Sequence, residues 1–154
     1  MTQRLNVFAV APKVLEPMMA LEPLIAASSL EPALIELVKL RASQINGCAN
    51  CLHMHLADTM KAGERLERIV LLDAWRESSM YTPRERAALA WTEALTKVAE
   101  THAPDADYEA LGAVFSESEI VYLTVLITAI NSWNRLAIGL RIQHPNDTRL
   151  KAAA

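Results

Sequence analysis

The stretch Glu36–His55, which reads ELVKLRASQINGCANCLHMH, constrains the fold of this chain more than any other. In and just before its first half, most apolar residues recur at intervals of three, four or seven, the period of an α-helix. Asn46-Gly47 then predicts a helix end, because glycine readily takes the left-handed conformation in which helices commonly stop. We therefore expect two helices joined by one tight turn, over about residues 30–45 and 48–62.

The remainder of the chain also favours helices. The whole chain has 154 residues with only four glycines, and no alternation of apolar and polar residues continues beyond four positions. Capping boxes at Thr82–Glu85 and Ser116–Glu119 mark two further helix starts. The fold class predicted from these features is all-α, a helical bundle formed by one domain over residues 1–154.

The two ends of the chain carry separate expectations. Residues 1–17 are expected to be extended, because Pro12 and Pro17 interrupt them, with a short helix following over about 18–27. The last helix, expected over about 117–142, is apolar nearly all round and so should be buried or lie at an interface. Since 52% of the residues are apolar, we expect part of this surface to be covered in a homo-oligomer.

Thiol redox chemistry is the function that the residues themselves indicate. Both cysteines of the chain lie in one unit, Cys48-Ala49-Asn50-Cys51, and His55 follows four residues later. Offsets of three, four and seven place these three side chains on one face of a helix. At a helix start, free N–H groups and the helix dipole favour the thiolate. One thiolate could attack an oxidant and the other could close a disulfide, with His55 moving the proton.

Other interpretations of the same residues stay open at this point. A C-x-x-C pair next to His53 and His55 is also a partial zinc signature, but its ligands are crowded and no second pair follows, so we predict no metal. The cysteines could be inert core residues and His55 an ordinary core histidine. His53 is expected at the surface. Glu36 could simply pair with Lys39 on a solvated face.

Composition and short motifs limit the partners, cofactors and cell compartment that we expect for this chain. A net charge of −3 and a pI near 5.8 give no electrostatic drive toward nucleic acid or anionic membranes. The apolar run Ile120–Ile130 is much shorter than the roughly 20 residues that span a bilayer, and no signal peptide is recognisable. No glycine-rich phosphate loop indicates a nucleotide or flavin cofactor. We expect a cytoplasmic protein without cofactor.

The motif Glu36…Cys48-Ala49-Asn50-Cys51…His55 resembles the core motif of the AhpD-like alkylhydroperoxidases within the carboxymuconolactone decarboxylase family. In that motif a glutamate is followed twelve positions later by a C-x-x-C, and a histidine stands four residues after the second cysteine. The segment Asn131-Ser132-Trp133-Asn134-Arg135-Leu136 is similar to the N-x-W-N-R-L segment of many small members. The resemblance covers about residues 14–143. One departure is the spacer between the cysteines, which lacks the histidine of some members.

The resemblance implies an all-helical protein that assembles as a dimer, trimer or hexamer through apolar helix faces. It also implies roles for four residues: Cys51 attacks the peroxide, Cys48 closes the disulfide, and Glu36 and His55 relay the proton that makes Cys51 nucleophilic. A lipoylated protein or another dithiol would return the electrons.

The sequence therefore predicts a thiol peroxidase, with two alternatives. One is a disulfide-switching redox sensor or oligomeric interaction protein without substantial turnover, based on the same thiols and the apolar last helix. The other is a lactone decarboxylase-like enzyme, although the decarboxylase proper lacks the cysteine pair and acts on a γ-lactone. A zinc-binding structural role ranks behind these.

Overall fold

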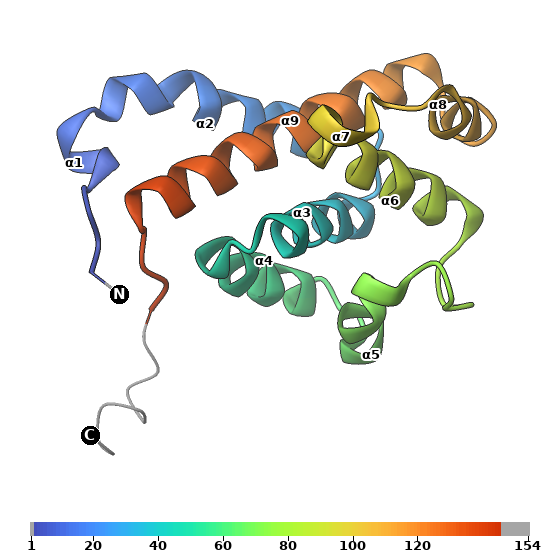
Figure 1. Ribbon diagram of the computed structural model, residues 1–154, viewed down its shortest axis with the longest axis horizontal. Helices are drawn as coiled ribbons and strands as arrows, with labels where there is room; N and C mark the ends of the chain where they lie inside the picture. The colour runs from blue at the N-terminus through green and yellow to red at the C-terminus, as the bar shows by residue number, and fades with distance from the viewer. Residues whose placement is uncertain (1, 146–154) are drawn as a thin grey trace.

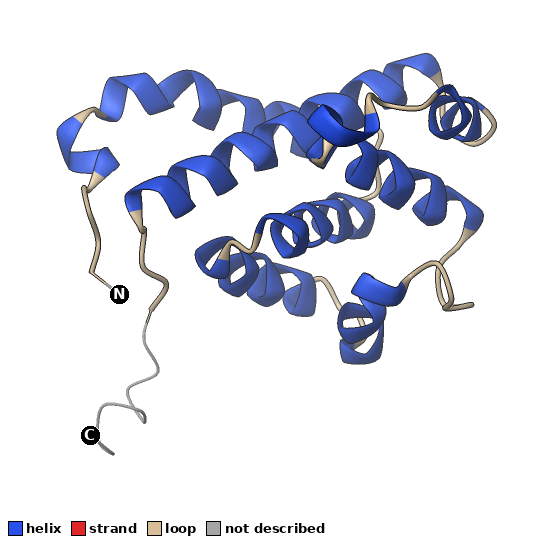
Figure 2. Ribbon diagram, in the orientation of Figure 1, coloured by secondary structure: helices blue, strands red, loops and turns tan. Residues whose placement is uncertain are grey.

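The structure, a computed structural model, describes residues 2–145, and every regular element within this range is a helix (Figure 2). Met1 and residues 146–154 of the predicted domain lie outside the described part. The all-α class is confirmed. The elements in chain order are α1 (Val7–Val10), α2 (Pro12–Ala26), α3 (Pro32–Asn46), α4 (Ala49–Lys61), α5 (Leu66–Val70), the 3₁₀-helix η1 (Leu71–Ala74), α6 (Pro83–Thr96), α7 (Val98–Thr101), α8 (Asp105–Gly112) and α9 (Glu117–Leu140).

Helix α3 lies at the centre and packs against α4, α6 and α9 (Figure 1). Its residues Leu37 and Val38 are completely buried, and they face different neighbours. Val38 belongs to the main cluster, formed largely by α3, α6 and α9, whereas Leu37 packs in a second cluster with α5, η1 and α6. A helix with apolar contacts on several sides is held firmly, so the groups that α3 carries toward α4 are fixed in place.

The helix ends follow the local signals in the sequence. Gly47 ends α3 in the left-handed conformation, with φ of 68°, and α4 begins two residues later. The capping boxes of Thr82 and Ser116 are both formed, at the starts of α6 and α9. These expectations are confirmed, and the turn at Gly47 places the cysteine pair at the start of α4.

The N-terminal expectation is wrong, because residues 7–10 and 12–26 are helical rather than extended up to residue 17. Pro12 occupies the first turn of α2, where its missing N–H is no loss. Pro17 and Pro23 lie inside the helix. The carbonyls that they leave without a helical partner belong to Lys13 and Met19, both exposed residues, so water can satisfy them.

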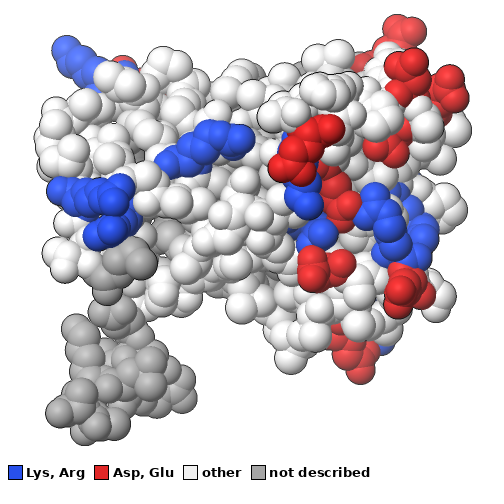
Figure 3. Space-filling view, in the orientation of Figure 1, with Lys and Arg blue, Asp and Glu red and all other residues white. Residues whose placement is uncertain are grey.

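Helix α2 lies along α9, and α1 extends beyond the bundle at the end where α9 stops (Figure 1). All three helices keep large apolar side chains exposed, among them Phe8 on α1, Val14 and Leu24 on α2, and Val121 and Ile138 on α9. In Figure 3, acidic side chains gather over the end that holds α8, while the charged side chains visible toward the opposite end are mostly basic. No helix within residues 2–145 combines the length and apolar character required to cross a membrane.

The left-handed turn at Gly47 predicts a measurable cost for a side chain there. A Cβ at Gly47 would meet no atom within 4 Å, so Gly47→Ala should lower the free energy of unfolding by about 1 kcal/mol through backbone strain alone. The matched control is Gly139→Ala in α9, where an added Cβ would likewise meet no atom within 4 Å and should raise stability by up to about 1 kcal/mol. Urea unfolding measures both. Equal effects of the two substitutions would contradict the prediction.

Candidate active site

Cys48 and Cys51 form a disulfide at the start of α4, with their Cα atoms 5.3 Å apart. Cys48 is the N-cap residue, and its Sγ accepts a hydrogen bond from the Cys51 N–H at 3.3 Å. The two residues are 1% and 2% exposed. The pair therefore lies within the positive end of the helix, where N–H groups favour a thiolate after reduction, as the spacing predicts.

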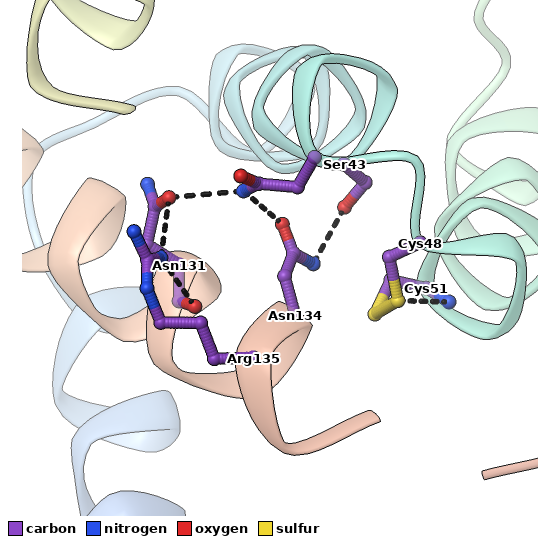
Figure 4. The surroundings of a disulfide bond; sticks show 7 residues. Ser43, Cys48, Cys51, Asn131, Asn134 and Arg135 are labelled. Atoms are coloured by element: carbon purple, nitrogen blue, oxygen red, sulfur yellow. Dashed lines mark hydrogen bonds between the residues drawn. A yellow bond between two sulfur atoms is a disulfide. The ribbon is translucent and has the colours of Figure 1, made fainter. Parts of the chain in front are cut away.

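The turn that carries Cys48 is held by side chains from α9 (Figure 4). The Cys48 N–H donates to the Ser43 carbonyl at 3.0 Å. The Ser43 hydroxyl in turn accepts from Asn134 Nδ2 at 3.1 Å, and Asn134 Oδ1 accepts from Asn46 Nδ2 at 2.8 Å. Asn134 is completely buried. Its amide thus fixes both the last turn of α3 and, through Ser43, the backbone of the first cysteine.

Asn131, one turn earlier on α9, extends this network. Its Oδ1 accepts from Asn46 Nδ2 at 2.9 Å and from Arg135 Nη1 at 2.9 Å (Figure 4). Its Nδ2 donates to Thr96 Oγ1 on α6 at 3.0 Å. From the sequence, Asn131 and Asn134 had no expected role beyond their place in the family-like segment. A usable signal was present, because two amides three residues apart in a strongly apolar helix must find buried partners.

Glu36 and His55 meet across the hairpin formed by α3 and α4. Glu36 Oε2 lies 3.0 Å from His55 Nδ1, and His55 is only 6% exposed. An ionised Glu36 keeps a proton on Nδ1, which leaves Nε2 as the ring nitrogen able to exchange a proton elsewhere. His55 follows Cys51 by one helical turn on the same face of α4. The structure thus brings Glu36 to the group of residues singled out from the sequence.

The charge state of Glu36 is set by opposing effects. Burial raises its pKa, but the hydrogen bond with His55 and the nearby charge of Lys39 outweigh burial and bring the pKa below its usual value. Lys39 Nζ lies 3.5 Å from the other carboxylate oxygen, Oε1. The expected pairing of Glu36 with Lys39 is present, but the same carboxylate also contacts His55. At neutral pH it is a carboxylate.

A cavity of about 450 Å³ opens beside the disulfide, and Cys48 contributes to its wall whereas Cys51 does not. The other walls come from the start of α4 and from the end of α9 with the residues after it: Gly47, Ala49, Asn50, Ala137, Ile138, Arg141, Ile142, Gln143 and His144. At its rim the rings of His53 and His144 stack, with centroids 5.2 Å apart. His53 is exposed, as expected. Cys48 is therefore the sulfur that a small molecule in this cavity would meet.

The possible cation ligands in the described part of the chain are not those of a zinc half-site. Donor atoms of Glu36, His55 and Asp58 lie within 4.8 Å of one another, and neither cysteine nor His53 belongs to this group. Asp58 is exposed, and His55 Nδ1 is already engaged by Glu36. The contact that the structure shows for His55 is thus with the Glu36 carboxylate rather than with a cysteine-based ligand set.

Comparison with known proteins gives consistent relatives. The sequence model of the carboxymuconolactone decarboxylase family matches residues 12–94. YdfG, an uncharacterized protein of Bacillus subtilis strain 168, is 39% identical over 140 residues, which cover 91% of this chain and 95% of YdfG.

Solved structures with similar folds include proteins described as AhpD-like or peroxidase-related. A protein of unknown function from Agrobacterium tumefaciens, described as a candidate antioxidant defence protein AhpD, matches with a TM-score of 0.91 and 49% identity over 95% of this chain and 100% of that chain. An uncharacterized peroxidase-related protein from Silicibacter sp. TM1040 matches with a TM-score of 0.79 and 22% identity over 92% and 75% of the two chains. The second likeness concerns the fold alone. The AhpD-like fold expected from the sequence is confirmed.

The buried amide network predicts a large effect of removing Asn134. Asn134→Ala would leave the Ser43 hydroxyl without its donor and the Asn46 amide with Asn131 alone, so the free energy of unfolding should fall by about 2–4 kcal/mol. The control is Ser132→Ala on the same helix, whose hydroxyl bonds only to the Thr128 carbonyl of its own helix and should change stability by less than about 0.5 kcal/mol. Chemical unfolding of the oxidised proteins compares them, and similar small losses in both variants would contradict the assignment.

Proposed function

The chain belongs to the carboxymuconolactone decarboxylase family, and we propose that it is a thiol peroxidase that reduces hydroperoxides through a disulfide cycle of Cys51 and Cys48. The observation that carries this proposal is the combination of a cysteine pair at the N-terminus of α4 with a buried His55 one turn further along the same helix, whose ring is hydrogen-bonded to Glu36 of α3. Family membership supports an enzymatic activity, and the cysteine pair favours redox chemistry over decarboxylation of a lactone.

In the proposed first step, the Cys51 thiolate attacks the terminal oxygen of the hydroperoxide. The O–O bond breaks, Cys51 becomes a sulfenic acid, and the departing alkoxide takes a proton from His55. In the second step the Cys48 thiolate attacks the Cys51 sulfur, and the S–O bond breaks to release water after protonation. One hydroperoxide and two thiols thus yield an alcohol, water and the disulfide. Glu36 stabilises the protonated imidazole between these transfers.

The cycle is completed by a dithiol reductant, which we propose reaches the disulfide through the cavity at Cys48. Both sulfurs are almost fully buried, so a flat protein surface cannot contact them, whereas a slender arm such as a dihydrolipoyl group fits a cavity of about 450 Å³. One thiolate of the arm attacks Cys48, the S–S bond breaks, and Cys51 leaves as a thiolate. The second thiol of the arm then releases Cys48.

Two further expectations complete the proposal. Thiols that must return to the reduced state suit a cytoplasmic setting. A homo-oligomer would cover the apolar side chains exposed on α1, α2 and α9, which include Phe8, Val14, Leu24 and Val121.

A redox switch without substantial turnover is the second candidate function. It is favoured by the near-complete burial of both sulfurs, and by the exposed apolar residues Met54, Leu56 and Met60 on the helix that carries them. Oxidation could alter how that helix contacts a partner. A change of assembly on oxidation, together with background peroxide consumption, would favour the switch.

Peroxide reactivity should depend on Cys51 in particular. In reduced protein mixed with a small excess of an organic hydroperoxide, the unaltered chain should form one internal disulfide, seen by mass spectrometry after alkylation of free thiols. Cys51→Ser should abolish this reaction. Cys48→Ser should still consume one equivalent through the sulfenic acid, and Glu36→Gln should slow the reaction by about 10²-fold or more. If Cys51→Ser consumed peroxide as fast as the unaltered chain, the proposed mechanism would be eliminated.

Access through the cavity predicts a selective effect on disulfide reduction. Ile138→Trp would fill part of the cavity, so reduction of the preformed disulfide by dihydrolipoamide should slow by about tenfold or more, because attack requires close approach to Cys48. The control is Val121→Trp, an exposed position near the other end of α9, which should leave the rate unchanged. Single-turnover kinetics without peroxide measure both. Equal rates in the two variants would place the access route elsewhere.

A further inference from the structure

The Glu36 carboxylate is the middle of a longer chain of polar contacts that continues away from the cysteines. On the far side of Glu36, Lys39 Nζ lies 3.5 Å from Oε1, and the same ammonium lies 3.1 Å from Glu22 Oε2 on α2. Glu22 Oε1 accepts a hydrogen bond from Trp133 Nε1 on α9 at 3.0 Å. The contacts therefore connect His55 to Trp133 and draw on α4, α3, α2 and α9.

The burial of this chain makes its charges effective. The side chain of Lys39 is only 13% exposed and that of Glu36 is 16% exposed, whereas Glu22 is 36% exposed and borders solvent. Lysine is seldom so buried unless it is paired, and a charge in such surroundings acts on its neighbours far more strongly than a charge in water. Lys39 is therefore placed to influence the ionisation of the groups beyond Glu36.

Resting on the proposed thiol chemistry, we infer that Lys39 is a positioning residue of the proton relay, held by Glu22 and Trp133. Its ammonium keeps Glu36 ionised and aims one carboxylate oxygen at His55, and thereby sets the pH at which Cys51 becomes a nucleophile. Glu22 balances the ammonium from the solvent side, and the Trp133 indole fixes Glu22 from α9. Trp133 thus gains a role through Glu22 and Lys39 rather than through contact with the sulfurs.

The charged groups around Glu36 determine the sign of the effect. Lys39 faces it from α3, His55 and Asp58 from α4, and Glu22 acts through Lys39 from α2. The group contributed by α9 is the neutral indole of Trp133.

The carboxylates of α6 and η1, Glu93 and Asp73, instead contact Arg41, which lies about 140° around α3 from Glu36. Within residues 2–145, Lys39 is therefore the cation in direct contact with the Glu36 carboxylate apart from a protonated His55. Without Lys39, the ionised forms of Glu36 and of the Cys51 thiol both lose a stabilising charge. Without the charge of Glu22, the Lys39 ammonium is less neutralised, so it stabilises the Glu36 carboxylate and the Cys51 thiolate more strongly.

Thiolate absorbance at 240 nm, followed against pH, tests this inference without peroxide. The titration is made in the full chain carrying Cys48→Ser, so that only Cys51 contributes. Adding Lys39→Met should raise the midpoint by about half a pH unit or more, as expected for loss of a nearby buried charge. Adding Glu22→Gln, which keeps the hydrogen-bonding shape, should lower the midpoint. Lys39→Arg should restore the parent value to within about 0.2 units.

The opposite signs separate a charge effect from structural damage, since loosened packing would not move the two midpoints in opposite directions. Lys61→Met, which removes an exposed cation ten residues after Cys51 on α4, is the matched control and should cause no shift. Unchanged midpoints in Lys39→Met and Glu22→Gln, or shifts in the same direction, would overturn the inference. A chain that fails to consume peroxide would refute the proposed function but would leave this titration interpretable.

Discussion

The buried hydrogen bonds from α9 to the end of α3 are the constraint on which the site depends. Helix α9 is otherwise apolar along its packed face, and apolar contacts alone would tolerate some sliding of one helix along another. The amides of Asn131 and Asn134 can be satisfied only where they meet Asn46 and Ser43. They therefore fix how far α9 extends past the cysteine turn, and so place Ala137 and Ile138 opposite Cys48 in the cavity wall.

Successive turns of α4 have different surroundings beyond this fixed turn. At the start of the helix the Cys48 sulfur borders a cavity with apolar and basic walls, and further along the helix a chain of alternating charges begins at His55 and ends near solvent at Glu22. Such a separation is physically useful, because an anionic sulfur benefits from the helix N-terminus while the acidic groups stay one turn or more away. The charges that are buried are paired, which limits the cost of burying them.

Local signals in the sequence were sufficient for much of the fold and for part of the site. The glycine at position 47 and the capping boxes predict helix ends because they act within a few residues, and the register of Cys48, Cys51 and His55 follows from one helix. Only the family resemblance assigned Glu36 to the site, because its contact with His55 joins two different helices. Lys39 was expected only as a possible surface partner of Glu36, and Glu22 and Trp133 were not identified as part of the site, since three different helices supply these residues. The error at residues 1–17 arose because proline both starts helices and interrupts them, and exposure decides which applies.

The unequal surroundings of the two sulfurs give the proposed cycle its direction. Cys48 meets the cavity, while Cys51 precedes His55 by one turn and has no place in the cavity wall. An incoming thiolate that attacks Cys48 expels Cys51 as the leaving group, which forms beside the imidazole able to stabilise it. The reduced protein thus regains directly the thiolate that the next hydroperoxide requires. Attack on Cys51 would instead expel Cys48 and leave Cys51 blocked as the mixed disulfide. An asymmetric site of this kind therefore favours reductive attack at Cys48 and returns Cys51 as the free thiolate.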